Sequence, residues 1–517
     1  MGAAADPVIT LLLLVLPVVS LAYWGSKRRR ANLPLPPQPP GWPIIGNLLS
    51  LPRTRAWERF TKWGQELNSD IVYLNFCGAG IVILNTFEVA MDLLDKRSGI
   101  YSDRPRAVLI DEMVGFGYML SRLKYGDRWR ERRRLFHEHL RPSKSSVYEP
   151  KILDQVRRTM VQLANRPPDK IQSIFRHMSG GIALSVSYGL SIGDKDDLHI
   201  AFAEEVLGKL NSLAGPAVFV LNRFPIFRHI PSWFPGARFK RQALQVRPYA
   251  DRFRELPFAA GVANLETPDA TDSFISRALE RMRESSEKVC LDAIKDTAAV
   301  AYVAGSETTY AGMSYWIRDM IVHPDVQSQL QNEIDSVLCG RLPEFTDLAK
   351  LPLLEASILE SLRLYTIVPT GVPHASSEDD VYRGYFIPKG STVIPNSWAM
   401  LHNEKDYPDA MVYNPSRFLR NGIIDPDVLD PRRIAFGFGR RICAGLHIAN
   451  ATLLMAAATV VALFEVRKVD GEEVEMGMKN GFVHHPNPYR CIFEVRNDVS
   501  GALLGQLEEE GAVIAGK

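Results

Sequence analysis

The stretch FGFGRRICAGLHIANATLLM, residues 436–455, decides the fold. It sets a single cysteine, Cys443, among glycines and arginines, and an apolar run typical of a buried helix follows. Gly437, Gly439 and Gly445 let the backbone turn tightly, so that amide N–H groups can point at the sulfur. The N-terminus of the following helix adds partial positive charge there. Both effects favour the thiolate, so we expect a lowered thiol pKa and a soft transition metal as the partner of the sulfur.

Two arginines beside the cysteine, Arg440 and Arg441, suit carboxylate groups, which arginine binds through two hydrogen bonds. A thiolate next to carboxylate-binding arginines suggests haem with its propionates, whereas a cysteine without such neighbours would be a small buried hydrophobe. The stretch resembles the haem-binding loop of the cytochrome P450 family. Its positions in the pattern F-x-x-G-x-R-x-C-x-G are Phe436, Gly439, Arg441, Cys443 and Gly445.

Further motifs of that family follow in the family's order, so the resemblance covers roughly residues 33–497. Glu360 and Arg363 match its Glu-x-x-Arg pair, one helical turn apart on the same helix face. The resemblance implies that Arg417, in NPSRF, completes a buried Glu-Arg-Arg network with them. Ser416 stands where the family usually has an acidic residue, which puts only a local contact in doubt.

The resemblance also implies residues that reach the haem propionates. Trp129 and Arg133 match the family's Trp-x-x-x-Arg, and His374 occupies a position where related enzymes also contact a propionate. A basic solvated helix face is the alternative for this segment. We assign that role to its other arginines, Arg130, Arg132 and Arg134.

The segment AAVAYVAGSETTYAG, residues 298–312, lies in a long predicted helix dense in small residues, which would also permit close helix packing. Ala304, Gly305, Glu307 and Thr308 match the family's Ala-Gly-x-(Asp/Glu)-Thr. Gly305 would leave room for dioxygen above the iron, and Thr308 would bond to a backbone carbonyl and orient water. Glu307 would relay protons from solvent as a general acid. The resemblance therefore implies Glu307 and Thr308 as catalytic residues.

Composition limits the classes of protein that remain. The chain has 517 residues, 46% of them apolar, and no linker-like stretch from about residue 50 to 497, so we expect one large domain over 48–497. Lys and Arg total 61 against 59 for Asp and Glu, which gives no basic field for a nucleic acid. Five widely spaced cysteines make neither a disulfide framework nor a zinc site, which favours a reducing compartment.

Periodicity predicts a mainly α fold with small β-sheets, the fold class of the cytochrome P450 family. A β-hairpin is expected over 71–85 and further strands over 381–397 and 490–495. A lid is expected over about 206–233. Helices are expected over 87–97, 126–140, 271–286, 290–321, 326–338 and 350–364.

The N-terminal segment predicts a membrane anchor. Residues 7–24 carry no charge, and the basic run KRRR follows at 27–30, so we expect a transmembrane helix within 1–26. A cleaved signal peptide is the alternative, but its charges would precede the apolar run. The positive-inside rule then places the residues after this segment in the cytosol as part of a single-pass protein. The resemblance described above implies that the membrane is that of the endoplasmic reticulum.

Two further segments border the domain. Residues 27–47 combine a stop-transfer signal with a stiff proline-rich hinge, for which a PxxP ligand is the rival interpretation. The last residues, 498–517, extend past the family-like region, and the sequence assigns no role to them.

The resemblance implies a monooxygenase that holds haem b through Cys443 and uses O2. It would oxidise a lipophilic small molecule by hydroxylation or epoxidation. Electrons would come from NADPH through a separate membrane-bound cytochrome P450 reductase, since the chain has no nucleotide-binding fingerprint. Rival functions are a haem-thiolate isomerase or dehydratase without a reductase, and a membrane-anchored haem sensor or carrier without turnover. Three basic residues near the cysteine loop would form a docking patch for the acidic surface of the reductase, with mere solvation as the alternative: Arg432, Arg433 and Arg440.

The substrate class rests on a weaker signal. Residues 224–243 and 373–400 are similar to fungal enzymes of the O-methylsterigmatocystin oxidoreductase type. That subgroup implies polyketides, terpenoids or other secondary metabolites as substrates.

Overall fold

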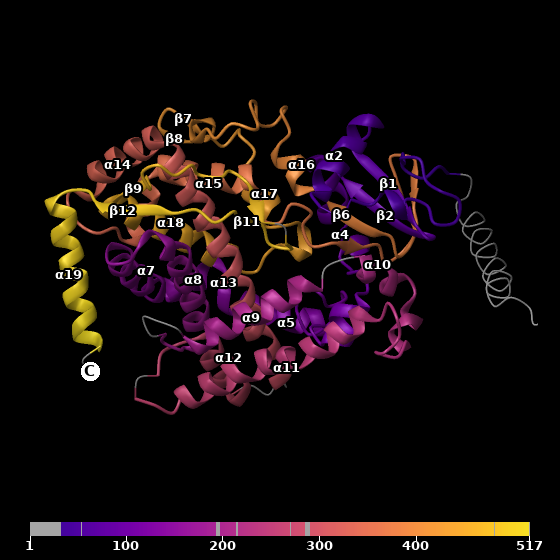
Figure 1. The fold of residues 1–517 in the computed structure, drawn as a ribbon, viewed down its shortest axis with the longest axis horizontal. Coiled ribbons are helices and arrows are strands. Elements are labelled where there is room, and N and C mark those ends of the chain that lie inside the picture. The colour runs from indigo at the N-terminus through magenta and orange to yellow at the C-terminus, as the bar shows by residue number, and fades with distance from the viewer. Residues whose placement is uncertain are drawn as a thin grey trace, which may run out of the picture. The chain divides into compact units, whose positions relative to one another are not determined.

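The computed structural model describes residues 33–52, 54–192, 197–213, 216–268, 270–284, 290–479 and 481–515. The expected anchor over 1–26 and the basic run over 27–30 lie outside these described residues. Helices dominate and the strands form small sheets (Figure 1), which confirms the predicted mainly α class.

The chain divides into two compact units. Unit 1 contains the chain up to Pro105 together with Thr370–Met400 and Phe438–Arg440, and unit 2 contains the rest. The single domain expected over 48–497 stays a prediction.

Unit 1 is built on a four-stranded sheet of order β1-β2-β6-β3. β1 (Ile71–Phe76) and β2 (Ala79–Leu84) form an antiparallel hairpin, which confirms the one predicted over 71–85. Gly78 takes a positive φ of 85° in the turn, a conformation that glycine adopts without strain. The other elements of this part of the chain are α2 (Ala56–Glu66), α3 (Phe87–Ala90), α4 (Ser98–Tyr101), β3 (His374–Ala375), β4 (Asp380–Tyr382), β5 (Tyr385–Ile387), β6 (Thr392–Pro395) and α16 (Ser397–Leu401).

The predicted helices are present with small shifts of their ends. The exception is 87–97, where α3 gives way to a π-helix at Met91–Lys96. The described part of the expected lid region is helical up to Ser212, over Pro216–Arg223 and in a 3-10 helix over Pro225–His229. The helices of unit 2 are α5 (Asp127–Leu140), α6 (Pro142–Ser145), α7 (Glu149–Ala164), α8 (Ile171–Tyr188), α9 (Leu198–Ser212), α10 (Pro216–Arg223), α11 (Arg238–Asn264), α12 (Phe274–Glu284), α13 (Leu291–Val322), α14 (Pro324–Leu338), α15 (Pro352–Tyr365), α17 (Arg432–Ala435), α18 (Leu446–Leu463) and α19 (Asp498–Ala515). Its strands are β7 (Leu419–Arg420), β8 (Ile423–Ile424), β9 (Phe464–Lys468), β10 (Met478–Lys479), β11 (His485–Pro486) and β12 (Cys491–Val495).

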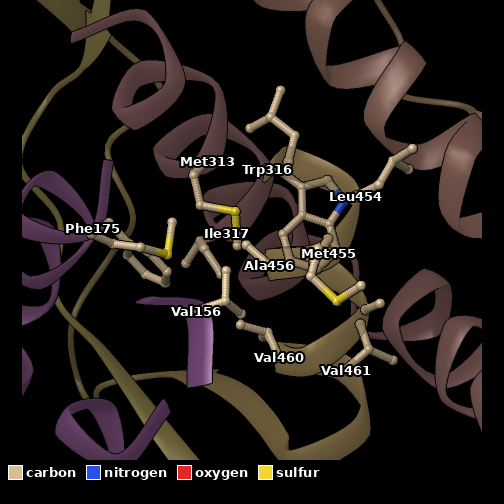
Figure 2. Packing of buried hydrophobic residues seen from close by; sticks show 14 of the residues in the cluster. Val156, Phe175, Met313, Trp316, Ile317, Leu454, Met455, Ala456, Val460 and Val461 are labelled. Atoms are coloured by element: carbon tan, nitrogen blue, oxygen red, sulfur yellow. The ribbon is translucent and has the colours of Figure 1, made fainter. Parts of the chain in front are cut away.

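The core of unit 2 forms where α13 packs along α8 and against α18. Figure 2 shows Met313, Trp316 and Ile317 of α13 meeting Met455 and Val460 of α18. These side chains are at most 1% exposed. Most residues of α13 are buried, its charged Asp296, Arg318 and Asp319 included, so α13 is a core helix of unit 2.

The helix that follows the cysteine, α18, is also a core helix. Within the described ranges it is the one helix long and apolar enough to cross a membrane, but 67% of that window is buried inside the protein. Its length and hydropathy therefore serve packing in unit 2.

The C-terminal segment forms a helix, α19, that packs on α7 and α18 (Figure 1). Leu504 and Leu507 join the apolar cluster of unit 2 and are at most 8% exposed. Asn165, which follows α7, donates a hydrogen bond of 2.9 Å to Glu508. The segment without an assigned role in the sequence thus covers part of the core.

Candidate functional site

The cysteine loop presents its sulfur at the N-terminus of α18. The N–H of Cys443 donates to the Phe436 carbonyl at 2.8 Å, which closes the loop. The backbone N–H groups of Gly445 and Leu446 donate to the sulfur. The Cys443 side chain keeps accessible surface although protein atoms surround it. This arrangement matches the one expected from the sequence.

The expected direction of the thiol pKa is wrong for the polypeptide. Burial raises the pKa of the Cys443 thiol above its ordinary value. The hydrogen bonds from Gly445 and Leu446 and the charge of Arg133 lower it, but by less. Since desolvation penalises an anionic sulfur, the loop alone does not compensate the thiolate, and a bound cation would have to do so.

Two predicted propionate residues, Trp129 and Arg133, lie beside this loop in unit 2, and a third, Arg441, belongs to the loop. Arg133 of α5 donates to the Ile442 carbonyl at 2.8 Å, and burial lowers its pKa. The Arg441 guanidinium lies 4.5 Å from the centre of the Trp129 ring and donates to the Leu123 carbonyl at 2.8 Å. Arginine charge and an indole therefore gather next to the cysteine.

Two glycines of the loop differ in whether the surrounding structure excludes a side chain at their position. Gly439 has a φ of 52°, and a Cβ there would lie 2.3 Å from the Leu94 carbonyl oxygen in unit 1. A side chain at this position is thus excluded by backbone. Gly445 has an ordinary φ, and a Cβ there would meet no protein atom within 4 Å. No contact with described residues requires glycine at 445, whose backbone N–H donates to the sulfur.

His374 lies in unit 1, in β3. Its side chain is 3% exposed, and its Nδ1 lies 2.8 Å from the Tyr101 carbonyl oxygen. A buried arginine that the sequence analysis missed, Arg104, donates to the carbonyls of Val372 and Pro373 at 2.7 and 2.8 Å. Unit 1 thus brings a second basic side chain to the segment that carries His374.

The Glu-Arg-Arg network is present in unit 2. Glu360 accepts from Arg363 Nε at 2.7 Å and Nη2 at 2.9 Å, and from Arg417 Nε at 3.0 Å. Glu360 and Arg363 are fully buried. The backbone N–H of Asn414 adds a fourth hydrogen bond to the carboxylate, and Ser416 takes no part in the network. The departure at 416 therefore leaves the three charges together.

One arginine assigned to the solvated face of α5 is buried instead. Arg132 is 4% exposed and donates to Asp296 of α13 at 2.6 and 2.9 Å. Arg254 of α11 binds the other oxygen of Asp296 at 2.6 Å. The solvated role predicted for Arg132 is wrong, because its guanidinium is one of two that neutralise a buried carboxylate.

The central part of α13 exposes one small residue. Ala304 is exposed although Val303 and Ser306 beside it are buried. Thr308 Oγ1 donates to the Ala304 carbonyl at 2.8 Å, as expected, and α13 stays α-helical there. A Cβ at Gly305 would lie 3.5 Å from the Ala183 Cβ in α8. This is an ordinary contact distance, so packing against α8 does not require glycine at 305. The room that the sequence analysis expects there for dioxygen stays a prediction, and Ala304 carries the accessible surface.

Glu307 is held by two partners that the sequence analysis missed. Arg176 of α8 donates to its Oε2 at 3.0 Å, and His485 Nε2 lies 2.7 Å from its Oε1. Burial raises the pKa of Glu307, but the His485 hydrogen bond and the Arg176 charge outweigh it and leave the pKa below its ordinary value. Glu307 is therefore an ionised carboxylate at neutral pH.

The predicted docking arginines differ in their surroundings. Arg432 binds Asp430 at 2.7 Å and Glu355 at 2.8 Å. Arg433 and Arg440 are exposed. Because two carboxylates already neutralise Arg432, its charge would contribute little to binding an acidic partner.

Comparison with known proteins defines the class. The cytochrome P450 family matches residues 36–493, and the chain belongs to this family of monooxygenases. It is 38% identical to cytochrome P450 monooxygenase ple1 of Rhodocybe pseudopiperita, with 93% of each chain covered. It is 36% identical to cytochrome P450 monooxygenase 98 of Postia placenta, with 94% and 95% covered. It is 35% identical to a tryptamine 4-monooxygenase of Psilocybe cyanescens, with 95% and 99% covered.

Family membership implies haem ligated by a cysteine thiolate, together with O2 and a redox partner. The donor set of unit 2 fits that group. It offers one accessible sulfur with two N–H donors, arginines for propionates, and open space beside Gly445. Among the residues that the structure describes, no cluster of three or more metal-binding side chains offers an alternative metal site.

Proposed function

We propose that the chain is a haem-thiolate monooxygenase in which Cys443 ligates the iron. The observation that carries this proposal is the accessible Cys443 sulfur, which accepts N–H bonds from Gly445 and Leu446 at the start of α18. Trp129, Arg133 and Arg441 of unit 2 would bind the propionates. The resemblance to the family assigns His374, in unit 1, a propionate contact of its own. When bound, thiolate-ligated haem supplies the oxidising chemistry, because the thiolate favours cleavage of the O–O bond.

Two residues of α13 would take part in proton transfer. The Thr308 hydroxyl donates its hydrogen bond to the Ala304 carbonyl, so its oxygen can accept a hydrogen bond from water. Glu307, the neighbouring ionised carboxylate, would take protons from solvent and pass them on to such a water. Ala304 presents only a methyl group and so leaves room beside this pair.

We propose an endoplasmic reticulum enzyme, anchored by residues 1–26, that receives electrons from NADPH through cytochrome P450 reductase. The charge-free run at 7–24 followed by KRRR supports the anchor. We propose a lipophilic secondary metabolite, a terpenoid or polyketide, as the substrate of hydroxylation or epoxidation. Because one relative is named for tryptamine, a substrate screen should include tryptamine beside these classes.

The test of the ligand is Cys443→Ser, with Cys290→Ser as the matched control because Cys290 is also exposed. The ferrous carbonyl form of the wild type and of Cys290→Ser should give the red-shifted Soret band of thiolate-ligated haem, and Cys443→Ser should lose it. An unchanged band in Cys443→Ser would refute the assignment. Conversion of a hydroperoxide without NADPH would favour an isomerase or dehydratase. NADPH consumption that no ligand stimulates, in the presence of reductase, would favour a sensor or carrier.

A further inference from the structure

The Glu307 carboxylate is bound at both ends by residues from different elements of unit 2. Arg176 of α8 binds Oε2 at 3.0 Å, and His485 of β11 binds Oε1 at 2.7 Å. All three side chains are largely shielded, with exposures of 27% for Arg176 and 14% for each of the other two. A carboxylate held by two directional donors has little freedom to rotate.

An aromatic ring supports both of these partners. Tyr310 follows Glu307 by three residues on α13, so the two side chains share one helix face. The His485 ring lies 5.2 Å from the Tyr310 ring centre, and the Arg176 guanidinium lies 4.2 Å from it. Tyr310 itself is 4% exposed. The ring therefore fixes the direction from which each donor approaches Glu307.

The two ring nitrogens of His485 have different surroundings. Nε2 lies 2.7 Å from Glu307 Oε1, whereas Nδ1 is buried and has no hydrogen-bond partner within the described part of the chain. The contact with Glu307 is therefore the polar contact that orients the imidazole ring.

We propose that His485 is a positioning residue that fixes Glu307 for proton transfer toward Thr308. This inference rests on the proton-carrying role proposed for Glu307. Arg176 also reaches Glu204 at 3.4 Å, and Glu204 is 47% exposed, so the network meets solvent on the α9 side. With one carboxylate oxygen anchored on His485 and the other on Arg176, Glu307 stays in one orientation between solvent and the oxygen site. His485 lies far from the AGSET motif in sequence, at the end of a two-residue strand.

The first experiment is a double-mutant cycle on the haem-loaded protein. The thermal midpoints of wild type, His485→Phe, Glu307→Leu and the double variant give the interaction between the two side chains, because leucine cannot accept a hydrogen bond. Phenylalanine keeps a ring against Tyr310 and removes both ring nitrogens, of which Nε2 is the one that contacts Glu307. We expect His485→Phe to lower the midpoint by less than half as much in the Glu307→Leu background. The control pair, His485→Phe with Glu494→Leu, should be additive, because Glu494 pairs with Arg467 elsewhere. Additive shifts for His485 and Glu307 would overturn the inference.

The second experiment measures proton delivery through the amount of hydrogen peroxide released. With reductase and NADPH but no substrate, the measured quantity is the share of NADPH oxidised that appears as hydrogen peroxide instead of water. Because a general acid contributes on the order of 100-fold or more when well placed, its misplacement in His485→Phe should raise the peroxide share several-fold. His485→Gln should restore most of the loss, since an amide N–H can replace Nε2.

The outcomes separate the two proposals. If Glu307→Gln leaves the peroxide share unchanged, the proton-carrying role of Glu307 fails. If Glu307→Gln raises it while His485→Phe does not, only the positioning role fails. If His485→Phe does not retain haem, His485→Asn, whose shorter amide does not span the 2.7 Å contact, takes its place.

Discussion

Replacing Glu360 by glutamine should destabilise unit 2 without changing the shape of the site. Glu360 is fully buried and forms ion pairs with two arginines, Arg363 and Arg417, which have exposures of 0% and 8%. Removing one partner of a buried ion pair costs about 3–5 kcal/mol. Arg363 keeps hydrogen bonds to the Leu401 and Ala410 carbonyls, so we expect a cost near the lower end, about 3 kcal/mol.

This cost converts to a measurable shift of the thermal midpoint. Unfolding entropy is about 2.1 cal/mol/K per residue, which gives about 1 kcal/mol/K for this chain. Glu360→Gln should thus lower the midpoint by about 3 °C in a thermal scan followed by tryptophan fluorescence.

Glu333→Gln is the matched control. Glu333 also accepts two hydrogen bonds, from the N–H groups of Leu353 and Leu354, but it faces no arginine there. A glutamine oxygen can still accept one of these hydrogen bonds, whereas its NH2 group cannot accept the other, so the cost should be about 1–2 kcal/mol. Equal shifts for the two variants would refute the argument that Glu360 compensates buried arginine charge.

Two further changes test the loop and the pH dependence of stability. Gly439→Ala should destabilise the protein more than Gly384→Ala, because both glycines have positive φ but only the Cβ at 439 would meet backbone, at 2.3 Å; equal thermal midpoints would contradict this. Burial lowers the pKa of His139 to about 4. In the unfolded chain this imidazole has its ordinary pKa, so below that pH the unfolded chain takes up a proton that the folded state does not bind. Stability from this group is full at pH 7 and falls by about 2 kcal/mol by pH 5. His139→Phe should remove that part of the pH dependence, as unfolding midpoints at the two pH values will show.

The sequence predicted the features that short contiguous patterns carry. The cysteine loop, the Glu-x-x-Arg pair and the Thr308 hydrogen bond each depend on residues a few positions apart on one loop or helix. The hairpin of unit 1 and the long helix α13 follow from local periodicity for the same reason.

The features that the sequence did not predict depend on distant partners. Arg132 is buried because Asp296, 164 residues away, receives it. Glu307 is fixed by Arg176, 131 residues before it, and by His485 near the C-terminal end. The direction predicted for the shift of the Cys443 thiol pKa was wrong, because the desolvation of this residue depends on how the whole unit packs. No periodicity or motif spacing reports such long-range packing.

The family-like region and the folded protein do not end at the same residue. The match to the family stops at 493, inside β12, whereas α19 runs on to Ala515 and inserts Leu504 and Leu507 into the core. A recombinant protein that ended at the family boundary would lack the last two residues of β12 and the whole of α19. The apolar surface of α7 and α18 on which α19 packs would then be exposed to solvent. Expression designs and C-terminal fusions should therefore begin their linker beyond residue 515.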